Sequence, residues 1–307
     1  MKIFEDIEFI NCYDCVATIG FFDGVHLGHR FLLNELTKIA RKKQKTTLVI
    51  TFDTHPQEIL KRRYAPPILT TKNEKLQLLE EFGIDNCLVL NFTDKLAEYS
   101  AYDFFSEILL KKLHIDTLLV GYDHRFGKNR AETFEDYLSY GKKLGIHVIQ
   151  AKPFSENDKH FSSSEIRRFL EQGNVAAANK ILGYRYHIKG IVTDGEKIGK
   201  RIGFPTANLN VNEIKKLIPA TGVYAVTAKL DNKTYKGMLN IGWRPTLGKS
   251  DEKTIEVHII GFEGNIYTET LQIAFVQRIR DEIKFKNIEE LVIQLKKDKE
   301  FVLSLIL

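Results

Sequence analysis

Short apolar runs alternate with longer amphipathic segments over the first 150 residues of the chain. Apolar runs of about five residues predict buried strands, and segments in which apolar residues recur every three or four positions predict helices. Strands that alternate with helices in this way indicate right-handed βαβ units around a parallel sheet. The pattern therefore predicts an α/β domain. Its strands are expected at 16–19, 47–52, 86–90, 117–120 and 147–150, and its helices at 30–42, 72–82, 101–113 and 133–144.

The pattern changes after about residue 184. Five strand-like segments separated by Gly, Asn and Asp turns follow one another, at 186–192, 222–230, 235–241, 254–260 and 271–278. A helix is expected over 287–303, where Asn287 with Glu290 three residues later is typical of a capping box. Consecutive strands closed by one helix favour an antiparallel barrel with a helical lid. We predict two domains, 1–183 and 184–307, with a short helical stretch at 164–182 before the boundary near Gly183.

The length of 307 residues is about twice that of a usual domain, which agrees with two domains. Hydrophobic residues make up 43% and charged residues 28% of the chain, so the composition excludes wholesale disorder and a membrane bundle. Residues 1–10 hold Glu5, Asp6 and Glu8 and lack an apolar core, which argues against a signal peptide. We expect a cytoplasmic protein with no membrane partner.

The three cysteines are too few and too scattered to imply a disulfide framework. Cys12 and Cys15 form a C-x-x-C, which would suit a redox pair or half of a zinc site. No second Cys/His pair lies at zinc spacing. We therefore interpret Cys12 and Cys15 as incidental thiols near the first strand.

The net charge of +5 lies in the second predicted domain, because residues 184–307 hold 20 Lys/Arg against 15 Asp/Glu. A basic domain can bind nucleic acid or a phosphorylated small molecule. The sequence shows no Lys/Arg stripe interleaved with aromatic residues, so the small molecule is favoured and no nucleic-acid partner is expected.

The segment Gly20–His29 reads G-F-F-D-G-V-H-L-G-H and follows the first predicted strand. Glycines at a strand end let the backbone approach a ligand, and the next helix start offers unpaired N–H groups to a phosphate. His26 and His29 would share one face of the first helical turn and could donate hydrogen bonds to phosphate oxygens during an in-line displacement. The alternative makes His26 a helix cap and His29 a surface residue. The H-x-G-H spacing after a glycine turn favours the phosphate site.

H-x-G-H is the element of the nucleotidyltransferase superfamily, and the longer string resembles the prokaryotic bifunctional riboflavin kinase/FMN adenylyltransferase (FAD synthetase) family. Thr51–Pro56, Gly121–Gly127 and Ser162–Arg167 resemble further motifs of that family in order and spacing. The resemblance implies a Rossmann-like nucleotidyltransferase domain that adenylylates FMN and releases pyrophosphate. It implies His26, His29 and Arg167 as catalytic residues. It also implies an ATP and phosphate site made by Gly20, Phe22, Asp23, Gly24, Gly28, Ser162, Ser163 and Ser164.

The motif residues beyond H-x-G-H have structural interpretations as well. Asp123 could accept hydrogen bonds from a ribose or flavin ring and Arg125 could pair with phosphate, or both could belong to a structural turn. Phe126 would stack on the flavin or fill the core, and His55 before Pro56 would contact ligand or shape a turn. The Ser162–Ser164 hydroxyls would cap a helix in any case, and with Arg167 they could clamp the β- and γ-phosphates.

The second predicted domain lacks the G-x-x-x-x-G-K-[ST] cradle and instead contains a loop with Gly199, Lys200 and Gly203. Glycines and basic residues in a loop can wrap a diphosphate. Thr206 and Asn208 follow in P-T-A-N and offer oxygen ligands that suit Mg²⁺, although this tetrapeptide alone could be a turn.

This loop, Gly237–Thr246 and Glu256–His258 together resemble the riboflavin kinase module. The resemblance implies a six-stranded antiparallel barrel with Glu256 as catalytic base. A carboxylate in an apolar strand can have its pKa raised by burial and can deprotonate a primary hydroxyl, which is compatible with that role. His258 shares its face with Glu256, and support of the strand could be its whole role. Arg280 would lie near flavin or nucleotide, with a surface salt bridge as an equal contender.

The leading hypothesis is a two-step enzyme that phosphorylates riboflavin to FMN and adenylylates FMN to FAD, with ATP, Mg²⁺ and flavins as ligands. The sequence departs from the family pattern at Phe21, Thr54, His124, Asn129, Glu132, Ser164, Gly261 and Thr268. Two alternatives therefore stay open, namely an enzyme with one of the two activities and a non-catalytic flavin-binding regulator. The oligomeric state is not indicated by the sequence.

Overall fold

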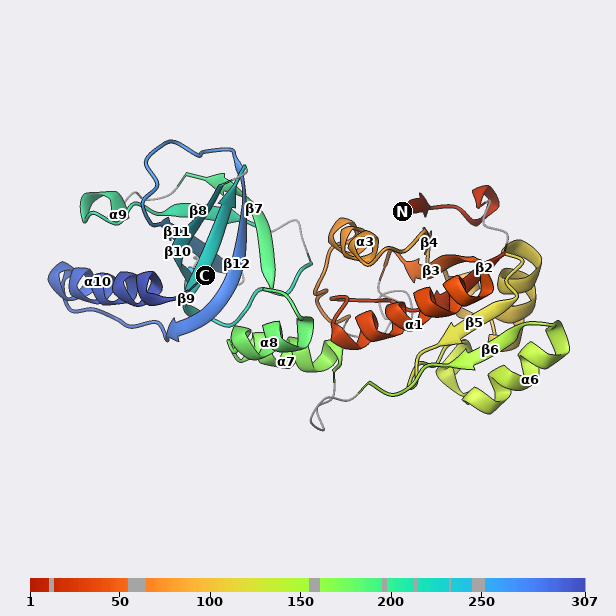
Figure 1. Cartoon of the computed structure of the whole chain (residues 1–307). Helices are drawn as coiled ribbons and strands as arrows, with labels where there is room; N and C mark the ends of the chain where they lie inside the picture. The colour runs from red at the N-terminus through yellow and green to blue at the C-terminus, as the bar shows by residue number, and fades with distance from the viewer. Residues whose placement is uncertain are drawn as a thin grey trace. The chain divides into compact units, whose positions relative to one another are not determined.

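The computed structural model describes residues 1–10, 14–54, 65–154, 161–194, 198–211, 215–231, 233–244 and 252–306. The chain forms two compact units, Met1–Ser163 and Ser164–Leu307 (Figure 1). Within these described ranges, no helix is long and apolar enough to cross a membrane. The functional boundary near Gly183 stays a prediction.

The first unit is built on a six-stranded sheet in which every pair of neighbouring strands is parallel. The strand order is β1-β4-β3-β2-β5-β6. The strands are β1 (Lys2–Phe4), β2 (Cys15–Ile19), β3 (Thr46–Phe52), β4 (Asn86–Leu90), β5 (Thr117–Val120) and β6 (His147–Gln150). The predicted parallel α/β domain is confirmed, and the short edge strand β1 is an addition to it.

Helices cover both faces of this sheet. Successive residues of a strand point to opposite faces, and apolar side chains on each face pack against helices. Ala17 and Ile19 of β2 belong to an apolar cluster with the π-helix η2 (Phe104–Lys112) and α6 (Phe134–Leu144). Val16 belongs to a second cluster with α1 (Leu27–Lys43) and α3 (Lys72–Glu81). The remaining elements are short: η1 (Ile7–Phe9), α4 (Asp94–Ala97), α5 (Ala101–Asp103) and η3 (Lys128–Arg130).

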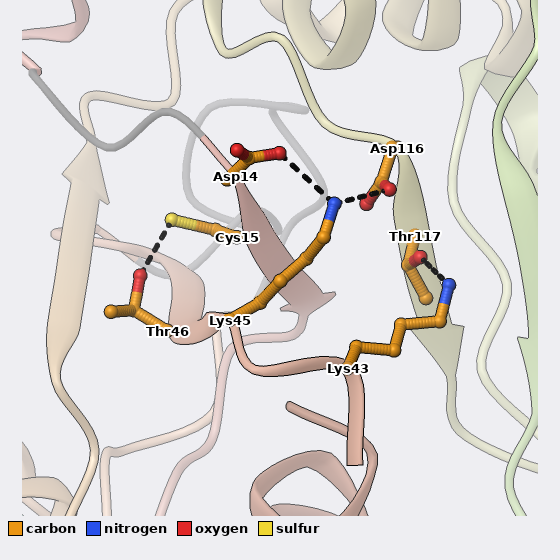
Figure 2. A network of polar contacts seen from close by, with 7 residues as sticks. All are labelled: Asp14, Cys15, Lys43, Lys45, Thr46, Asp116 and Thr117. Atoms are coloured by element: carbon orange, nitrogen blue, oxygen red, sulfur yellow. Dashed lines mark hydrogen bonds and ion pairs between the residues drawn. The ribbon is translucent and has the colours of Figure 1, made fainter. Parts of the chain in front are cut away.

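A polar network joins the positions where β2, β3 and β5 begin (Figure 2). Lys45 Nζ donates to Asp14 Oδ1 at 3.0 Å and to Asp116 Oδ2 at 2.5 Å. Lys43 Nζ donates to Thr117 Oγ1 at 2.6 Å. These contacts hold three strand starts together at the amino edge of the sheet.

Cys15 begins β2 and lies fully buried in this network, with its Sγ 3.2 Å from Thr46 Oγ1. The residue is disulfide-bonded, so the expectation of an incidental free thiol at this position is wrong. Cys12 lies outside the described residues. Cysteine spacing alone does not predict whether Cys15 is oxidised or reduced.

The second unit contains a closed antiparallel barrel with strand order β10-β11-β8-β7-β12-β9. Its strands are β7 (His187–Thr193), β8 (Ala207–Asn210), β9 (Gly222–Leu230), β10 (Lys233–Arg244), β11 (Glu252–Ile259) and β12 (Thr270–Arg280). The expectation of a six-stranded barrel is confirmed. The sixth strand is β8, a four-residue segment that contains the end of P-T-A-N and carries no strand-like apolar run.

The C-terminal helix α10 (Ile288–Ser304) packs on the barrel, with Val302 fully buried against Phe204 and Met238. Asn287 caps this helix by accepting from Glu290 N at 2.9 Å. The reciprocal half of the expected capping box is absent, because the Glu290 carboxylate accepts from Lys286 N instead.

The predicted helical stretch at 164–182 consists of two helices, α7 (Ser163–Glu171) and α8 (Val175–Leu182). Gly173 separates them with φ +74°, a backbone conformation that favours glycine. Asn179 of α8 donates to Phe275 O at 2.9 Å, and Ala220 N donates to Leu170 O at 3.0 Å. Both helices are therefore tied to the barrel unit.

Candidate active sites

The turn after β2 has a strained backbone. Phe22 and Val25 have φ of +53° and +35°, and Gly24 lies between them at +80°. A β-branched residue at positive φ is unfavourable and persists only where its surroundings impose it. Phe22 and Val25 are buried at 2% and 0% exposure, so core packing holds the turn in this form. Gly20 precedes it, and a Cβ there would lie 3.0 Å from the Phe22 ring.

Asp23 fixes the same turn from inside. Its carboxylate is 3% exposed and accepts hydrogen bonds from Leu69 N at 2.9 Å and from Thr70 N at 3.0 Å. Thr70 Oγ1 also donates to it, and Gly24 N donates to Thr70 Oγ1 at 3.0 Å. These contacts bind the turn to residues 69–70. The carboxylate of Asp23 thus supports the proposed phosphate site through the backbone shape of the turn.

His26 and His29 lie together at the start of α1, as their spacing predicts. Their rings stack with centroids 3.7 Å apart and an interplanar angle of 20°. His26 is the N-cap of α1, and its Nδ1 accepts from His29 N at 3.4 Å. Neutral His26 therefore carries its proton on Nε2, which makes Nε2 a donor. The capping interpretation and the ligand-donor interpretation are compatible for this residue.

Both imidazoles are held neutral. Burial, followed by the nearby Arg30 charge, lowers the pKa of His26 to about 4. Burial also lowers the pKa of His29 well below its ordinary value, with further contributions from His26, His124 and Lys75. Within the described part of the chain, His29 Nδ1 is buried without a hydrogen-bond partner. Neutral imidazoles that donate N–H can bind phosphate oxygens without the repulsion that two stacked cations would suffer.

Gly28 makes room for this pair. A Cβ at Gly28 would lie 3.2 Å from both Cε1 and Nδ1 of His26. Contacts of this length are tighter than ordinary van der Waals contact, so a side chain here would push the His26 ring away. The expected phosphate-site role of Gly28 is thus compatible with a steric one.

Lys75 on α3 is a candidate that the sequence interpretation missed. Its side chain is 3% exposed, and Nζ donates to Phe21 O at 3.1 Å, Thr51 Oγ1 at 3.1 Å and Phe52 O at 2.8 Å. Burial lowers its pKa to about 8. The lysine therefore joins the carboxyl ends of β2 and β3 beside the histidines. Its position four residues before buried Leu79 on a helix was the available signal.

The residues after β5 that were predicted to contact flavin differ in their exposure. Asp123 and Arg125 are exposed, whereas Phe126 is half-buried in the core, its ring stacked on Tyr137 at 4.6 Å. The Tyr137 hydroxyl accepts from Phe126 N at 2.9 Å and donates to Phe126 O at 3.1 Å. Core packing thus accounts for Phe126. Asp123 and Arg125 are placed to meet a ligand or solvent.

The remaining predicted residues of this site lie around the start of α7. Ser163 Oγ donates to Asp23 O at 2.9 Å. Ser162 is half-buried and Ser164 is exposed, while Arg167, one turn into the helix, is only 9% exposed. His55 lies outside the described residues.

In the barrel, strand register sets Glu256 between two asparagines. Glu256 of β11 is opposite Asn208 of β8 on one side and Asn240 of β10 on the other. Residues directly opposite on neighbouring strands project to the same face. The fold therefore brings Glu256 and Asn208 together. Asn240 joins them, and its Nδ2 donates to Glu282 Oε1 at 3.4 Å.

The loop before β8 is compact. A Cβ at Gly199 would lie 2.2 Å from Phe204 O, so only glycine fits there, and Gly203 has φ +83°. Phe204 N donates to Gly199 O at 2.8 Å, which closes the loop. Lys200 lies in the short helix α9 (Ile198–Arg201), and the Thr206 side chain that follows is exposed.

His258 supports this loop. Its Nδ1 lies 2.8 Å from Pro205 O, so Nδ1 donates and neutral His258 has an unprotonated Nε2. Burial lowers its pKa, although the hydrogen bond to Pro205 opposes the shift. The histidine of E-x-H therefore connects β11 to P-T-A-N, a role beyond the strand support considered from the sequence.

Arg280 is occupied by an ion pair. Its Nε lies 3.0 Å and its Nη2 2.8 Å from Asp298 Oδ2, and Asp298 is 1% exposed. Gln294 Nε2 donates to the same carboxylate at 2.8 Å. This pairing fastens α10 to β12. A surface salt bridge was one of the two expectations for Arg280. The salt bridge is present, but its Asp298 partner is buried.

Comparison with known proteins covers both units. Residues 10–165 match the FAD synthetase family and residues 182–306 match the riboflavin kinase family. The chain is 38% identical over 286 residues to a bifunctional riboflavin kinase/FMN adenylyltransferase of Listeria monocytogenes, covering 93% of this chain and 90% of that protein. The corresponding protein of Bacillus subtilis is 37% identical with the same coverage.

A solved structure is also similar over its full length. It is described as a macrolide-efflux protein from Streptococcus pneumoniae, is 31% identical and covers 99% of each chain with a TM-score of 0.90. The family matches divide between the two units, and the curated relatives cover most of the chain. The chain belongs to the bifunctional riboflavin kinase/FMN adenylyltransferase family.

Proposed function

We propose that the chain makes FAD from riboflavin in two ATP-dependent steps. The barrel phosphorylates riboflavin to FMN, and the parallel-sheet unit adenylylates FMN and releases pyrophosphate. The observation that supports this best is that one chain matches both family domains and that its curated relatives are named for both activities. The functional domains are 1–183 and 184–307, and the expected address is the cytoplasm.

The kinase step uses Glu256 as its base. The carboxylate takes the proton of the riboflavin 5′-hydroxyl as that oxygen attacks the γ-phosphorus of ATP. A new O–P bond forms and the bond from the γ-phosphorus to the β,γ-bridging oxygen breaks, so that ADP leaves. Register beside Asn208 and Asn240 keeps Glu256 next to polar side chains that can orient the hydroxyl. Gly199, Lys200 and Gly203 would hold the nucleotide phosphates.

The donor set at this site fits Mg²⁺. Thr206 offers a hydroxyl and Asn208 an amide oxygen, and Glu256 lies opposite Asn208. Among the described residues, three or more His, Cys, Asp or Glu side chains do not gather into a metal site. A magnesium ion held by Thr206 and Asn208 would therefore share its coordination with substrate phosphates and water, as Mg²⁺ usually does. When bound it would neutralise charge on the phosphates.

The adenylyl step depends on positioning and charge stabilisation. A phosphate oxygen of FMN attacks the α-phosphorus of ATP, and the bond to the α,β-bridging oxygen breaks to release pyrophosphate. His26 Nε2–H and His29 would donate to the oxygens on which negative charge develops. Arg167 and the serines at 162–164 would bind the β- and γ-phosphates. Asp123 and Arg125 would face the flavin side, with His55 as a further flavin contact, and Arg280 would lie near the kinase flavin.

One assay tests the proposal. The full chain is incubated with riboflavin, ATP and Mg²⁺, and flavins are separated by chromatography, with wild type, His29→Ala and Glu256→Gln in parallel. Wild type should form FMN and then FAD. His29→Ala should accumulate FMN, and Glu256→Gln should form neither product from riboflavin while still converting supplied FMN to FAD.

The outcomes separate the parts of the proposal. A wild-type chain that makes neither FMN nor FAD, with oxidised or reduced riboflavin, would refute the function. FMN without FAD would leave a kinase alone, and full-rate FMN formation by Glu256→Gln would refute only the choice of base.

A further inference from the structure

His124 lies on the turn that follows β5, beside the strained turn that follows β2. The two strands are neighbours and run parallel, with Val16 opposite Thr117 and Thr18 opposite Leu119. Because parallel strands end at the same edge, the segments after them share the region in which α/β sheets bind ligands. His124 N donates to Gly121 O at 3.1 Å, which fixes the turn.

The His124 ring is packed on one side and lacks a polar partner. It stacks on Phe126 with centroids 6.0 Å apart and an interplanar angle of 29°, and the Tyr137 hydroxyl holds Phe126 in place. Within the described ranges, Nε2 of His124 is buried and makes no hydrogen bond. A buried nitrogen of this kind needs an explanation, and a ligand that supplies the missing partner is one.

His124 and His29 are close enough to affect each other. Proximity to His124 contributes to the low pKa of His29, after burial and His26. Burial and Arg130 lower the pKa of His124 to about 4, and Asp123 opposes them. His29 Nδ1 is likewise buried without a partner among the described residues. Two neutral imidazoles with unpartnered nitrogens therefore belong to one region, which Lys75 also borders.

We propose that His124 is a third phosphate-binding imidazole of the adenylyl-transfer site and donates from Nε2 to a phosphate oxygen of FMN or ATP. The proposal rests on the adenylyl transfer proposed above and adds a binding residue to it. A phosphate is the ligand class that fits, because it presents several acceptors to N–H donors and its charge favours the protonated ring. No residue on the strand-end turns other than the histidines offers such an orphaned nitrogen among those described.

The chain also supplies a suitable variant. His124→Phe keeps a ring to stack on Phe126 and removes only the nitrogens. His147→Phe makes the same chemical change at an exposed position where β6 begins, at the opposite edge of the sheet. Circular dichroism melts establish that both variants fold, and His124→Gln replaces His124→Phe if the latter does not.

The test measures FAD formation from supplied FMN and ATP by the full-length chain, with KM determined for each substrate at pH 6 to 8. His124→Phe should raise one KM by about 10- to 100-fold, the effect of losing a hydrogen bond to a charged group, while His147→Phe should change neither. A change confined to the KM of FMN assigns the FMN phosphate, and one confined to the KM of ATP assigns ATP. Calorimetry with FMN and with ATP in two buffers should show less proton uptake on binding to His124→Phe.

Contrary outcomes are distinct. If wild type makes FAD but His124→Phe has unchanged KM values and proton uptake, the role of His124 is refuted while the proposed function stands. A fall in kcat alone together with a lower melting temperature would also refute it, because it would indicate a structural role. If wild type makes no FAD and neither substrate binds, the proposed function fails and the His124 assignment fails with it.

Discussion

At the edge of the parallel sheet where β2, β3 and β5 begin, the lysines are matched to acceptors: Lys45 bonds Asp14 and Asp116, and Lys43 bonds Thr117 (Figure 2). At the opposite edge, His29 Nδ1 and His124 Nε2 are buried without partners in the described part of the chain. Both lysines are thus bonded where these strands begin, although Asp116 Oδ1 is buried there without a partner, and two imidazole nitrogens lack partners where the strands end, among the described residues.

The contrast separates structural from functional polar groups. A buried polar atom without a hydrogen bond costs stability, so a fold retains it only when something else requires it. Loss of an amino-edge contact should therefore cost stability and leave catalysis intact. Loss of a histidine at the carboxyl edge should do the reverse.

The largest expected effect is that of His29→Ala on adenylyl transfer. Removal of one donor to developing phosphate charge should lower kcat for FAD formation by about 10²- to 10³-fold. The unfolding free energy should change by about 1 kcal/mol or less, because the nitrogen removed is unsatisfied in the free protein. Stopped assays with supplied FMN and urea titrations measure the two quantities. If His29→Ala lowered the unfolding free energy by as much as it raised the activation free energy, the polar groups at the two edges would not divide into structural and functional ones.

The next effect is a loss of stability in acid. Folding lowers the pKa of His26 and of His124 from 6.5 to about 4, so between these values the unfolded chain binds more protons than the folded one. The stabilisation is complete above pH 6.5 and is lost as the pH falls toward 4. Each histidine should cost about 2 kcal/mol of unfolding free energy between pH 7 and pH 5.

Urea titrations at pH 7 and pH 5 check this difference. The loss of unfolding free energy between pH 7 and pH 5 should be smaller in His124→Phe than in wild type by about 2 kcal/mol. The loss in His147→Phe should equal that of wild type. An identical pH dependence in all three proteins would contradict the buried-neutral description of His124.

The sequence predicted the parts of these sites that are local. His26 and His29 could be paired because three-residue spacing on a helix start fixes their common face, and the strand periods predicted both folds. The four-residue strand β8 was not predicted, because barrel closure alone makes a strand of a segment with so little apolar pattern. The register of Glu256 with Asn208 depends on that closure, so it could not be predicted from the sequence.

The supporting contacts were not predictable, because they join residues far apart in the sequence. The Asp23 carboxylate belongs to a motif that resembles a phosphate site, yet its partners, Leu69 and Thr70, lie 46 and 47 residues away. Lys75 is charged and would ordinarily be placed on a solvated helix face. Only the fold brings the carbonyls of Phe21 and Phe52 to it.

Lys75→Met tests whether a satisfied lysine at the carboxyl edge acts on both stability and catalysis. The change strands three acceptors at the ends of β2 and β3, which should cost about 1–3 kcal/mol of unfolding free energy. Adenylyl transfer should fall by about 10-fold, because the Phe21 carbonyl borders the His26 turn. Riboflavin phosphorylation by the barrel should be unchanged.

Lys72→Met is the matched control on the same helix, since Lys72 pairs with Glu5 at the surface. It should leave both rates at wild-type values. If Lys75→Met also kept wild-type adenylyl transfer, Lys75 would belong with the structural network of the amino edge.

Lys45→Met should have the smallest effect. Lys45 bonds two carboxylates, but the side chains of Asp14 and Asp116 are 82% and 45% exposed, so solvent screens both pairs. The unfolding free energy should fall by about 0.5–1 kcal/mol and the difference should shrink in high salt. FAD formation should be unchanged, because the network lies at the edge away from the histidines. If Lys45→Met instead lost much of its adenylyl transfer and kept wild-type stability, the contacts where the strands begin would control the geometry where they end. Hydrogen-bonded polar groups at the amino edge could then not be assigned a purely structural role.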